Sequence, residues 1–271
     1  KRLFQIYPER FLIKVPLTPA GYLAARRLSE AGVRVNFTLG FSARQNYLAA
    51  MLAEPAFVNV FLGRLNSFVT DNDLGDGENV GEKTLAASQG VVTELRELRS
   101  LVTQQIAASM RAGDQVTALA GVNVMTLPVA VADDFVSSEV SSEELVPLSD
   151  RQFPVALEGG QPEAAVNTLW EVPPSFRQVT AAMLDEPLED YDADDLQAFF
   201  VERGLGGLFP EWSEDDVQVI CEDGKIPSYS RWADRLHSGD VALDALMSIS
   251  GLKQFAADQQ ALDDRIVAHF S

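Results

Sequence analysis

Short apolar runs rich in β-branched residues alternate with amphipathic stretches in the first half of the chain, from residue 11 to residue 131. The apolar runs predict buried strands, and the stretches between them predict helices at residues 19–31, 42–54, 82–101 and 113–120. This alternation is typical of βα units around a parallel sheet. The expected strands lie in FLIKVPL (11–17), VRVNFTL (33–39), AFVNVFL (56–62), QQIAASM (104–110) and VNVMTLPVAV (122–131).

Five such units are fewer than the eight of a closed (β/α)8 TIM barrel. Parallel sheets rarely leave both edges uncovered, so we interpret the five strands as strands 4 to 8 of an α/β barrel. On this interpretation the barrel is N-terminally incomplete, and its first three units lie upstream of Lys1. A smaller open sheet is the alternative.

The pattern changes after residue 131 to polar, helical segments separated by turns rich in glycine and proline. The sequence therefore predicts two parts. Residues 1–135 form the barrel units, and residues 136–271 form an acidic, mostly helical extension that ends in an amphipathic helix at residues 252–270.

Charge is distributed unevenly between these parts. Residues 1–131 contain 13 Lys and Arg against 11 Asp and Glu, whereas residues 132–271 contain 8 against 29. An acidic second half argues against a nucleic-acid partner, because phosphate backbones need a basic surface. No apolar run approaches the roughly 18 residues of a membrane helix, and no secretory signal opens the chain, so we expect a cytoplasmic protein without a membrane partner.

Lys14 lies in the middle of the first apolar strand, where we expect it to be buried. Burial lowers the pKa of an amine and supplies the neutral nucleophile that forms an imine with a ketone. The alternatives are a lysine at a strand end that reaches solvent, or one half of a buried ion pair.

Polar side chains follow on the next strands. Asn36 and Thr38 are two residues apart and so share one face, where an amide and a hydroxyl can order a carbinolamine or a water. Arg64 and Arg111 follow two later strands, and Ser109 shares a predicted face with Arg111. Two arginines at strand ends suit a phosphate group, although surface salt bridges are the alternative for each.

The order of these motifs resembles the transaldolase family. FLIKVPLTPAGYLAARRLSEAGVRVNFTLGFS resembles its signature, in which a lysine-bearing strand is followed one helix later by an N-T-L-FS strand. The resemblance continues at FLGR (61–64), AASMR (107–111), TLPVAV (126–131) and, after the acidic insertion, FAADQQALDDRI (255–266).

The resemblance implies catalytic roles for Lys14, as the Schiff-base lysine, and for its polar neighbours Asn36 and Thr38. It implies that the family's acid/base carboxylate lies on the first barrel strands, upstream of Lys1. Asn59 stands where relatives often have a serine, which alters one contact to the substrate. The implied contacts to the substrate phosphate are Arg64, Arg111, Ser109 and Asn59.

By this resemblance the chain is expected to transfer a dihydroxyacetone unit between sugar phosphates in the pentose phosphate pathway. Sedoheptulose 7-phosphate and glyceraldehyde 3-phosphate would give erythrose 4-phosphate and fructose 6-phosphate. The alternatives are a fructose-6-phosphate aldolase-like enzyme and a catalytically silent sugar-phosphate-binding fragment. No cofactor or metal is expected, because the only histidines, His237 and His269, lie in the extension. A homodimer is a further expectation.

Overall fold

The computed structural model describes residues 2–270 and contains one parallel sheet of five strands. The strands are neighbours in chain order, as successive βα units require. The five predicted strands are confirmed in position and direction. The sheet does not close, and the fold is consistent with a transaldolase-type (β/α)8 barrel. The strands are β1 (Ile13–Pro16), β2 (Val35–Thr38), β3 (Phe57–Phe61), β4 (Gln104–Ala108) and β5 (Val124–Met125).

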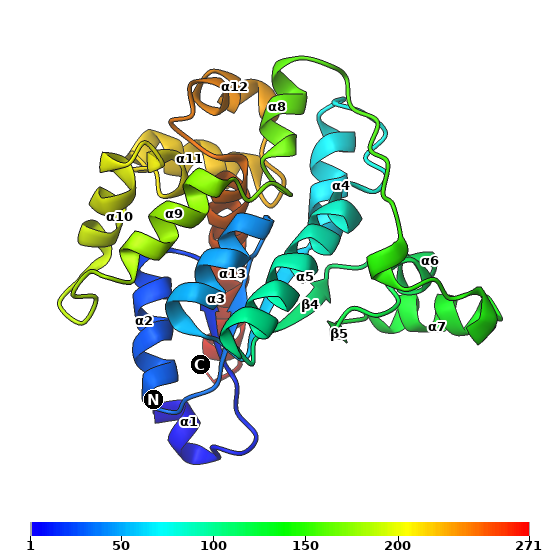
Figure 1. Ribbon diagram of the computed structural model, residues 1–271, viewed down its shortest axis with the longest axis horizontal. Helices are drawn as coiled ribbons and strands as arrows, with labels where there is room; N and C mark the ends of the chain where they lie inside the picture. The colour runs from blue at the N-terminus through cyan, green and yellow to red at the C-terminus, as the bar shows by residue number, and fades with distance from the viewer. Residues whose placement is uncertain (1, 271) are drawn as a thin grey trace.

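Helices connect the strands and cover one face of the sheet. In Figure 1, α2, α3 and α5 lie on the viewer's side and α13 lies behind α3. The predicted caps are confirmed: Thr18 Oγ1 accepts from Gly21 N, and Ser42 Oγ accepts from Gln45 N, each at 3.1 Å. The helices of this half are α1 (Arg2–Ile6), α2 (Pro19–Glu30), α3 (Ala43–Ala53), α4 (Leu62–Asp71), α5 (Val80–Arg99) and α6 (Asp114–Ala118).

Two expectations for this half are wrong. The last strand ends at Met125 rather than at residue 131, because Pro128 adopts the extended conformation that precedes a helix, and the following valines belong to α7 (Val129–Ser137). Helix α4, which follows β3 directly, is not among the helices that the sequence pattern predicts. No side chain caps α4, so it carries no local start signal.

The remaining helices form the extension and share a core with the sheet. Phe209 packs edge-on against Tyr22 of α2, with ring centroids 5.6 Å apart, and Tyr22 packs against Phe37 of β2. The extension is therefore packed onto the βα units. Its elements are α8 (Gln161–Asn167), α9 (Pro174–Met183), α10 (Ala193–Glu202), α11 (Glu214–Asp223), α12 (Tyr229–Ser238), α13 (Leu243–Phe270) and short 3-10 turns at Ser142–Glu144, Leu148–Asp150 and Gly206–Leu208.

Helix α13 begins at Leu243 rather than at residue 252, and its first turns are buried. The buried carboxylate of Asp244 accepts from Arg44 Nε at 2.8 Å, from Arg44 Nη2 at 2.9 Å and from Ser42 Oγ at 2.6 Å. One turn later, Ser248 Oγ donates to the carbonyl oxygen of Leu39 and accepts from Gln45 Nε2. These contacts dock α13 onto the segment that joins β2 to α3.

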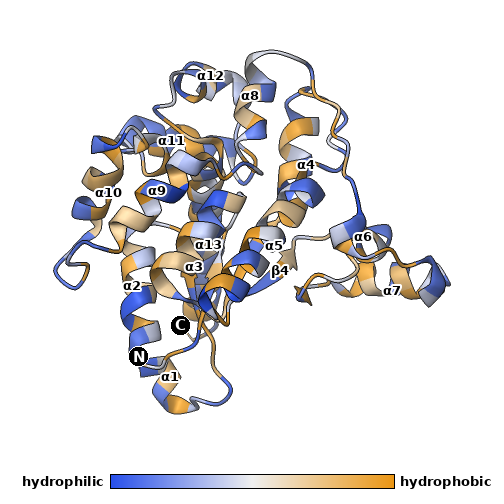
Figure 2. Cartoon of the chain, viewed as in Figure 1, coloured by the Kyte–Doolittle hydropathy of each residue, from blue (hydrophilic) through white to orange (hydrophobic). Residues whose placement is uncertain are grey.

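Hydrophobic and hydrophilic residues alternate along the helices in Figure 2. Within residues 2–270, none of the helices combines the length and the apolar character needed to cross a lipid bilayer.

We expect Asp244→Asn to lower the free energy of unfolding by about 3 kcal/mol, because it leaves the buried Arg44 guanidinium without its counter-charge. Urea denaturation measures this, and Asp234→Asn, an exposed change on α12, is the control with little effect.

The same variant has a pH signature. Burial alone would raise the pKa of Asp244, but attraction to Arg44 and the hydrogen bonds outweigh it and hold the pKa below its usual value. The pair therefore stabilises the fold above the unfolded pKa of about 3.9 and is lost as the pH falls through the lower folded value. The wild type should lose more stability than Asp244→Asn below about pH 4. Parallel acid curves would contradict this assignment.

Candidate active site

The residues predicted on β1 and β2 share one face of the sheet. Lys14 pairs in register with Asn36, and Pro16 with Thr38, so their side chains lie on the same side. On the opposite side, Val15 is packed into the core under the helices. The candidate residues thus project from the face that becomes the interior when such a sheet curves into a barrel.

The expectation that Lys14 is buried is wrong. Its side chain is exposed, and β1 is an edge strand of the open sheet. Within residues 2–270, its Nζ makes no hydrogen bond or ion pair, and its described contact is the ring of Phe255, 5.8 Å from the centroid. In this structure, burial therefore does not make the Lys14 amine nucleophilic.

Three buried polar atoms near the ends of the strands have no hydrogen-bond partner: Asn36 Oδ1, Thr38 Oγ1 and Arg64 Nη1. An unpaired buried polar atom costs about 1–3 kcal/mol, so native proteins keep few of them. Such atoms are common where a ligand or water completes the bonding. Their positions on the inner side of β2 and at the start of α4 make this region a candidate binding site.

Arg64 lies in the first turn of α4 and is 8% exposed. Its guanidinium carbon lies 5.5 Å from the ring centroid of Phe61 and 5.6 Å from that of Phe255. A Cβ added to Gly251 of α13 would lie 2.9 Å from Arg64 Nη1, so only a glycine lets the helix approach this closely. Two cations, Lys14 and Arg64, therefore lie near the same ring of α13, that of Phe255.

Burial lowers the pKa of Arg64, repulsion from Arg111 lowers it further, and Asp258 of α13 acts in the opposite direction. The two guanidinium groups are close enough to repel each other. Arg111 is exposed and, among the described residues, belongs to no ion pair. A site with two adjacent, unneutralised arginines favours an anion.

The expected common face of Ala107, Ser109 and Arg111 is wrong. Ala107 is buried in the core on the helix side, and the strand ends at Ala108. Ser109 is half-buried and adopts a left-handed conformation, with φ of 64°, which breaks the two-residue alternation. This turn places Arg111 close to Gly63, the residue that precedes Arg64. A Cβ added to Gly63 would lie 2.8 Å from Arg111 Nε.

Asn59 is 3% exposed, and both ends of its amide are occupied by backbone groups. Its Nδ2 donates to the carbonyl oxygen of Phe37, and its Oδ1 accepts from Gly40 N at 3.2 Å. In this structure the amide of Asn59 supports the end of β2 through hydrogen bonds to the backbone.

The sequence reading missed Phe255 and Gly251 as parts of this site. Phe255 was predicted only as part of the last amphipathic helix and of the family-like motif at residues 255–266, and no role was predicted for Gly251 because that helix was expected to begin at residue 252. Both contacts join segments that are far apart in the chain. Of the predicted residues, Lys14 and Arg64 lie near the ring of Phe255, and Arg64 also lies near Gly251.

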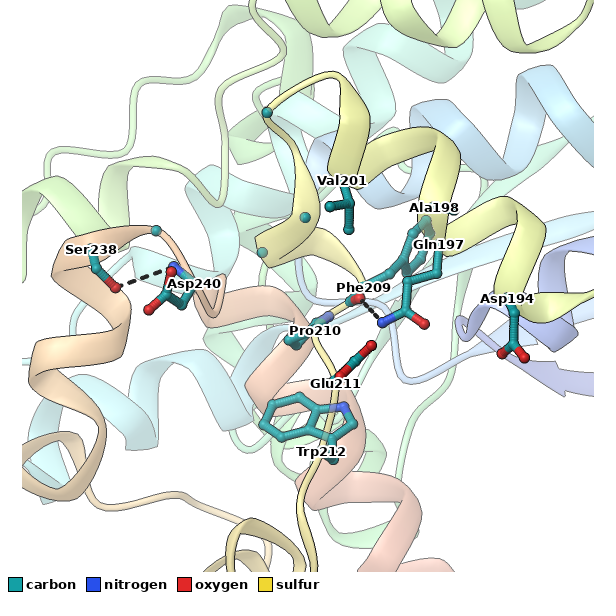
Figure 3. A pocket seen from close by; sticks show the side chains of 14 residues that line it. Asp194, Gln197, Ala198, Val201, Phe209, Pro210, Glu211, Trp212, Ser238 and Asp240 are labelled. Carbon is teal, nitrogen blue, oxygen red and sulfur yellow. Dashed lines mark hydrogen bonds between the residues drawn. The ribbon is translucent and has the colours of Figure 1, made fainter.

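A separate groove of about 1180 Å³ lies in the extension and is lined by none of these residues. In Figure 3, Gln197 of α10 donates to the carbonyl oxygen of Phe209, and the carboxylates of Asp194, Glu211 and Asp240 surround the opening. The sheet face with Lys14 is open in contrast, because the strands do not close around it.

We expect Gly63→Ala to destabilise the protein by about 1–3 kcal/mol, since its Cβ would collide with the backbone carbonyl oxygen of Ser109 and with Arg111. Gly90→Ala in α5 is the matched control. Its Cβ meets nothing within 4 Å, so it should stabilise by about 0.5–1 kcal/mol through helix propensity. Thermal unfolding of both variants measures the difference, and equal shifts would refute the close packing at Gly63.

Comparison with known proteins shows the family to which the chain belongs. A family model described as Transaldolase/Fructose-6-phosphate aldolase matches residues 1–200. "Probable transaldolase 2" of Bacillus anthracis is 40% identical over 127 residues, 46% of this chain and 51% of the relative. "Probable transaldolase" of Thermus thermophilus is 38% identical over 133 residues, 48% of this chain and 53% of the relative.

A third relative, "Probable transaldolase" of Exiguobacterium sibiricum, is 35% identical over 146 residues, 53% of this chain and 60% of the relative. The chain thus spans about half the length of the relatives it matches. The family match itself covers most of the chain, including every strand. The chain therefore belongs to the transaldolase/fructose-6-phosphate aldolase family.

Proposed function

We propose that this chain carries the Schiff-base and phosphate-binding part of a transaldolase-type site, which transfers a dihydroxyacetone unit between sugar phosphates of the pentose phosphate pathway. The observation that carries this proposal is the placement of Lys14 and Arg64 around Phe255, at 5.8 Å and 5.6 Å from its ring centroid. An amine and a guanidinium that lie near one ring could bind the carbonyl and phosphate ends of one sugar phosphate.

The charges of Arg64 and Arg111 support the binding of the substrate phosphate. Arg64 and Arg111 repel each other, and a phosphate between them would relieve this repulsion with charge-assisted hydrogen bonds. Arg64 also lies in the first turn of α4, where the helix dipole and free N–H groups favour an anion. Ser109 lies beside Arg111 and adds a hydroxyl.

The chemistry starts at the amine of Lys14. Its Nζ attacks the C2 carbonyl of sedoheptulose 7-phosphate, and loss of water from the carbinolamine gives an iminium. Loss of the C4 hydroxyl proton breaks the C3–C4 bond, which releases erythrose 4-phosphate and leaves an enamine on Lys14. The enamine then attacks the aldehyde carbon of glyceraldehyde 3-phosphate, whose oxygen takes up a proton, and water hydrolyses the new iminium to fructose 6-phosphate.

Asn36 and Thr38 would act at the carbinolamine. Their unpartnered buried oxygens lie on the face that carries Lys14 and can hydrogen-bond to the C2 hydroxyl or to the water that leaves. The proton transfers need an acid/base group. Among residues 2–270, no carboxylate contacts Lys14.

Two observations favour the other candidates. The exposure of Lys14 admits water, which suits an aldolase that releases dihydroxyacetone from the enamine instead of passing it on. The lack of a described carboxylate at Lys14 suits a sugar-phosphate-binding protein without turnover. Both alternatives keep the phosphate contacts at Arg64 and Arg111.

Borohydride trapping with fructose 6-phosphate, followed by peptide mass spectrometry, tests the imine. We expect a reduced adduct on Lys14 that Lys14→Arg abolishes, since a guanidinium keeps the charge but forms no imine. Lys83→Arg is the matched control, because Lys83 stacks on Trp170 at 4.1 Å, outside the site, and should leave the adduct unchanged.

Product analysis separates the functions. Sedoheptulose 7-phosphate formed from fructose 6-phosphate and erythrose 4-phosphate supports the transferase, and free dihydroxyacetone supports the aldolase. An adduct without either product supports the silent binding protein. The absence of an adduct on Lys14 would refute the Schiff-base proposal.

A further inference from the structure

Glu82 is a buried carboxylate that the chemistry above does not use and that is hydrogen-bonded to Asn66 and Gln115, which follow Arg64 and Arg111 in the chain. It lies in the first turn of α5, is 5% exposed and, among the described residues, is paired with no cation. A buried carboxylate of this kind is costly unless hydrogen bonds satisfy its oxygens. Glu82 Oε1 accepts from Gln115 Nε2 at 2.5 Å, and Oε2 accepts from Asn66 Nδ2 at 3.0 Å.

Gln115 connects Glu82 to the backbone of Arg111. Its Oε1 accepts from Arg111 N at 2.6 Å and from Ala112 N at 3.2 Å. A carboxylate can only accept, so Glu82 fixes which end of the Gln115 amide faces the backbone. The conformation of the turn that carries Arg111 therefore depends on a charge on α5.

Asn66 makes the corresponding link to Arg64. Asn66 follows Arg64 on α4, and its Oδ1 accepts from Gly81 N at 2.7 Å while its Nδ2 donates to Glu82. Glu82 thus ties the helix that carries Arg64 to the turn that carries Arg111. No other described side chain bonds to both elements.

We propose that Glu82 and Gln115 are positioning residues that hold Arg111 beside Arg64 at the spacing needed by the phosphate group of a sugar-phosphate substrate. This inference rests on the proposed function for its substrate class. The two guanidinium groups repel each other, and the exposed Arg111 side chain has no described ion-pair partner that would keep it in place. We call the hydrogen bonds between Glu82 and Gln115 and between Gln115 and the backbone of Arg111 the Glu82–Gln115 clamp. The clamp holds the backbone of Arg111 in place against that repulsion.

Exchanging the two side chains gives a sharp test. Gln115→Glu places two carboxylates against each other, so the clamp should open. In Glu82→Gln, the new amide has one oxygen to accept from Gln115 and Asn66 in place of two. Its own N–H group therefore faces the N–H group of one of them, and that hydrogen bond is lost. In the double variant, the amide introduced at position 82 can donate to the carboxylate introduced at position 115 and accept from Asn66. That carboxylate can still accept from the backbone of Arg111.

The readout is Lys14 trapping at subsaturating fructose 6-phosphate, compared with trapping by dihydroxyacetone, which lacks the phosphate. We expect Gln115→Glu to lower trapping with fructose 6-phosphate about ten- to hundredfold relative to dihydroxyacetone, and the double variant to restore most of it. Gln178→Glu, an exposed change of the same charge on α9, is the control with no effect. Circular dichroism confirms that each variant is folded.

Equal losses with both ligands, or no recovery in the double variant, would overturn the clamp. The affinity for inorganic phosphate, measured by calorimetry on the same proteins, separates this inference from the Schiff-base proposal. If the wild type traps no imine but binds phosphate, weaker binding in Gln115→Glu and recovery in the double variant support the clamp alone. Unchanged or absent phosphate binding overturns it.

Discussion

The buried ion pair between Arg44 and Asp244 is the contact on which the arrangement of the site depends. It joins residues 200 positions apart in the sequence, with Ser42 as a third partner. A carboxylate with no solvent exposure is tolerated only because four hydrogen bonds satisfy it, from Arg44, Ser42 and the backbone N–H of Ala245. Through it, the first turn of α13 is fixed on the end of β2.

The positions of the α13 residues at the site depend on this ion pair. Helical geometry places Ser248 one turn on, Gly251 against Arg64, and Phe255 one turn further, where its ring lies near both Arg64 and Lys14. Beyond Phe255 the helix is exposed. The extension is acidic as a whole, but its contribution to the site consists of a glycine, an aromatic ring and the more distant charge of Asp258.

The parts of the fold that could be read from the sequence are those set by local rules. Strands such as β3 follow from apolar β-branched runs, and Thr18 and Ser42 mark helix starts because their side chains cap the adjacent N–H groups. Helix α4 lacks such a cap and was missed. The grouping of Lys14, Asn36 and Arg64 followed from family motifs. The exposure of Lys14 could not be read in this way, because it depends on which strands lie beside β1.

The contact between Lys14 and Phe255 has a consequence for biosynthesis. A ribosome makes Lys14 about 240 residues before Phe255. While the intervening residues are made, the nascent chain therefore carries the amine without the helix that contacts it. Closing so long a loop is slow relative to forming the neighbouring βα units. The sheet can therefore form as the chain emerges, while the site is completed only when α13 has left the ribosome.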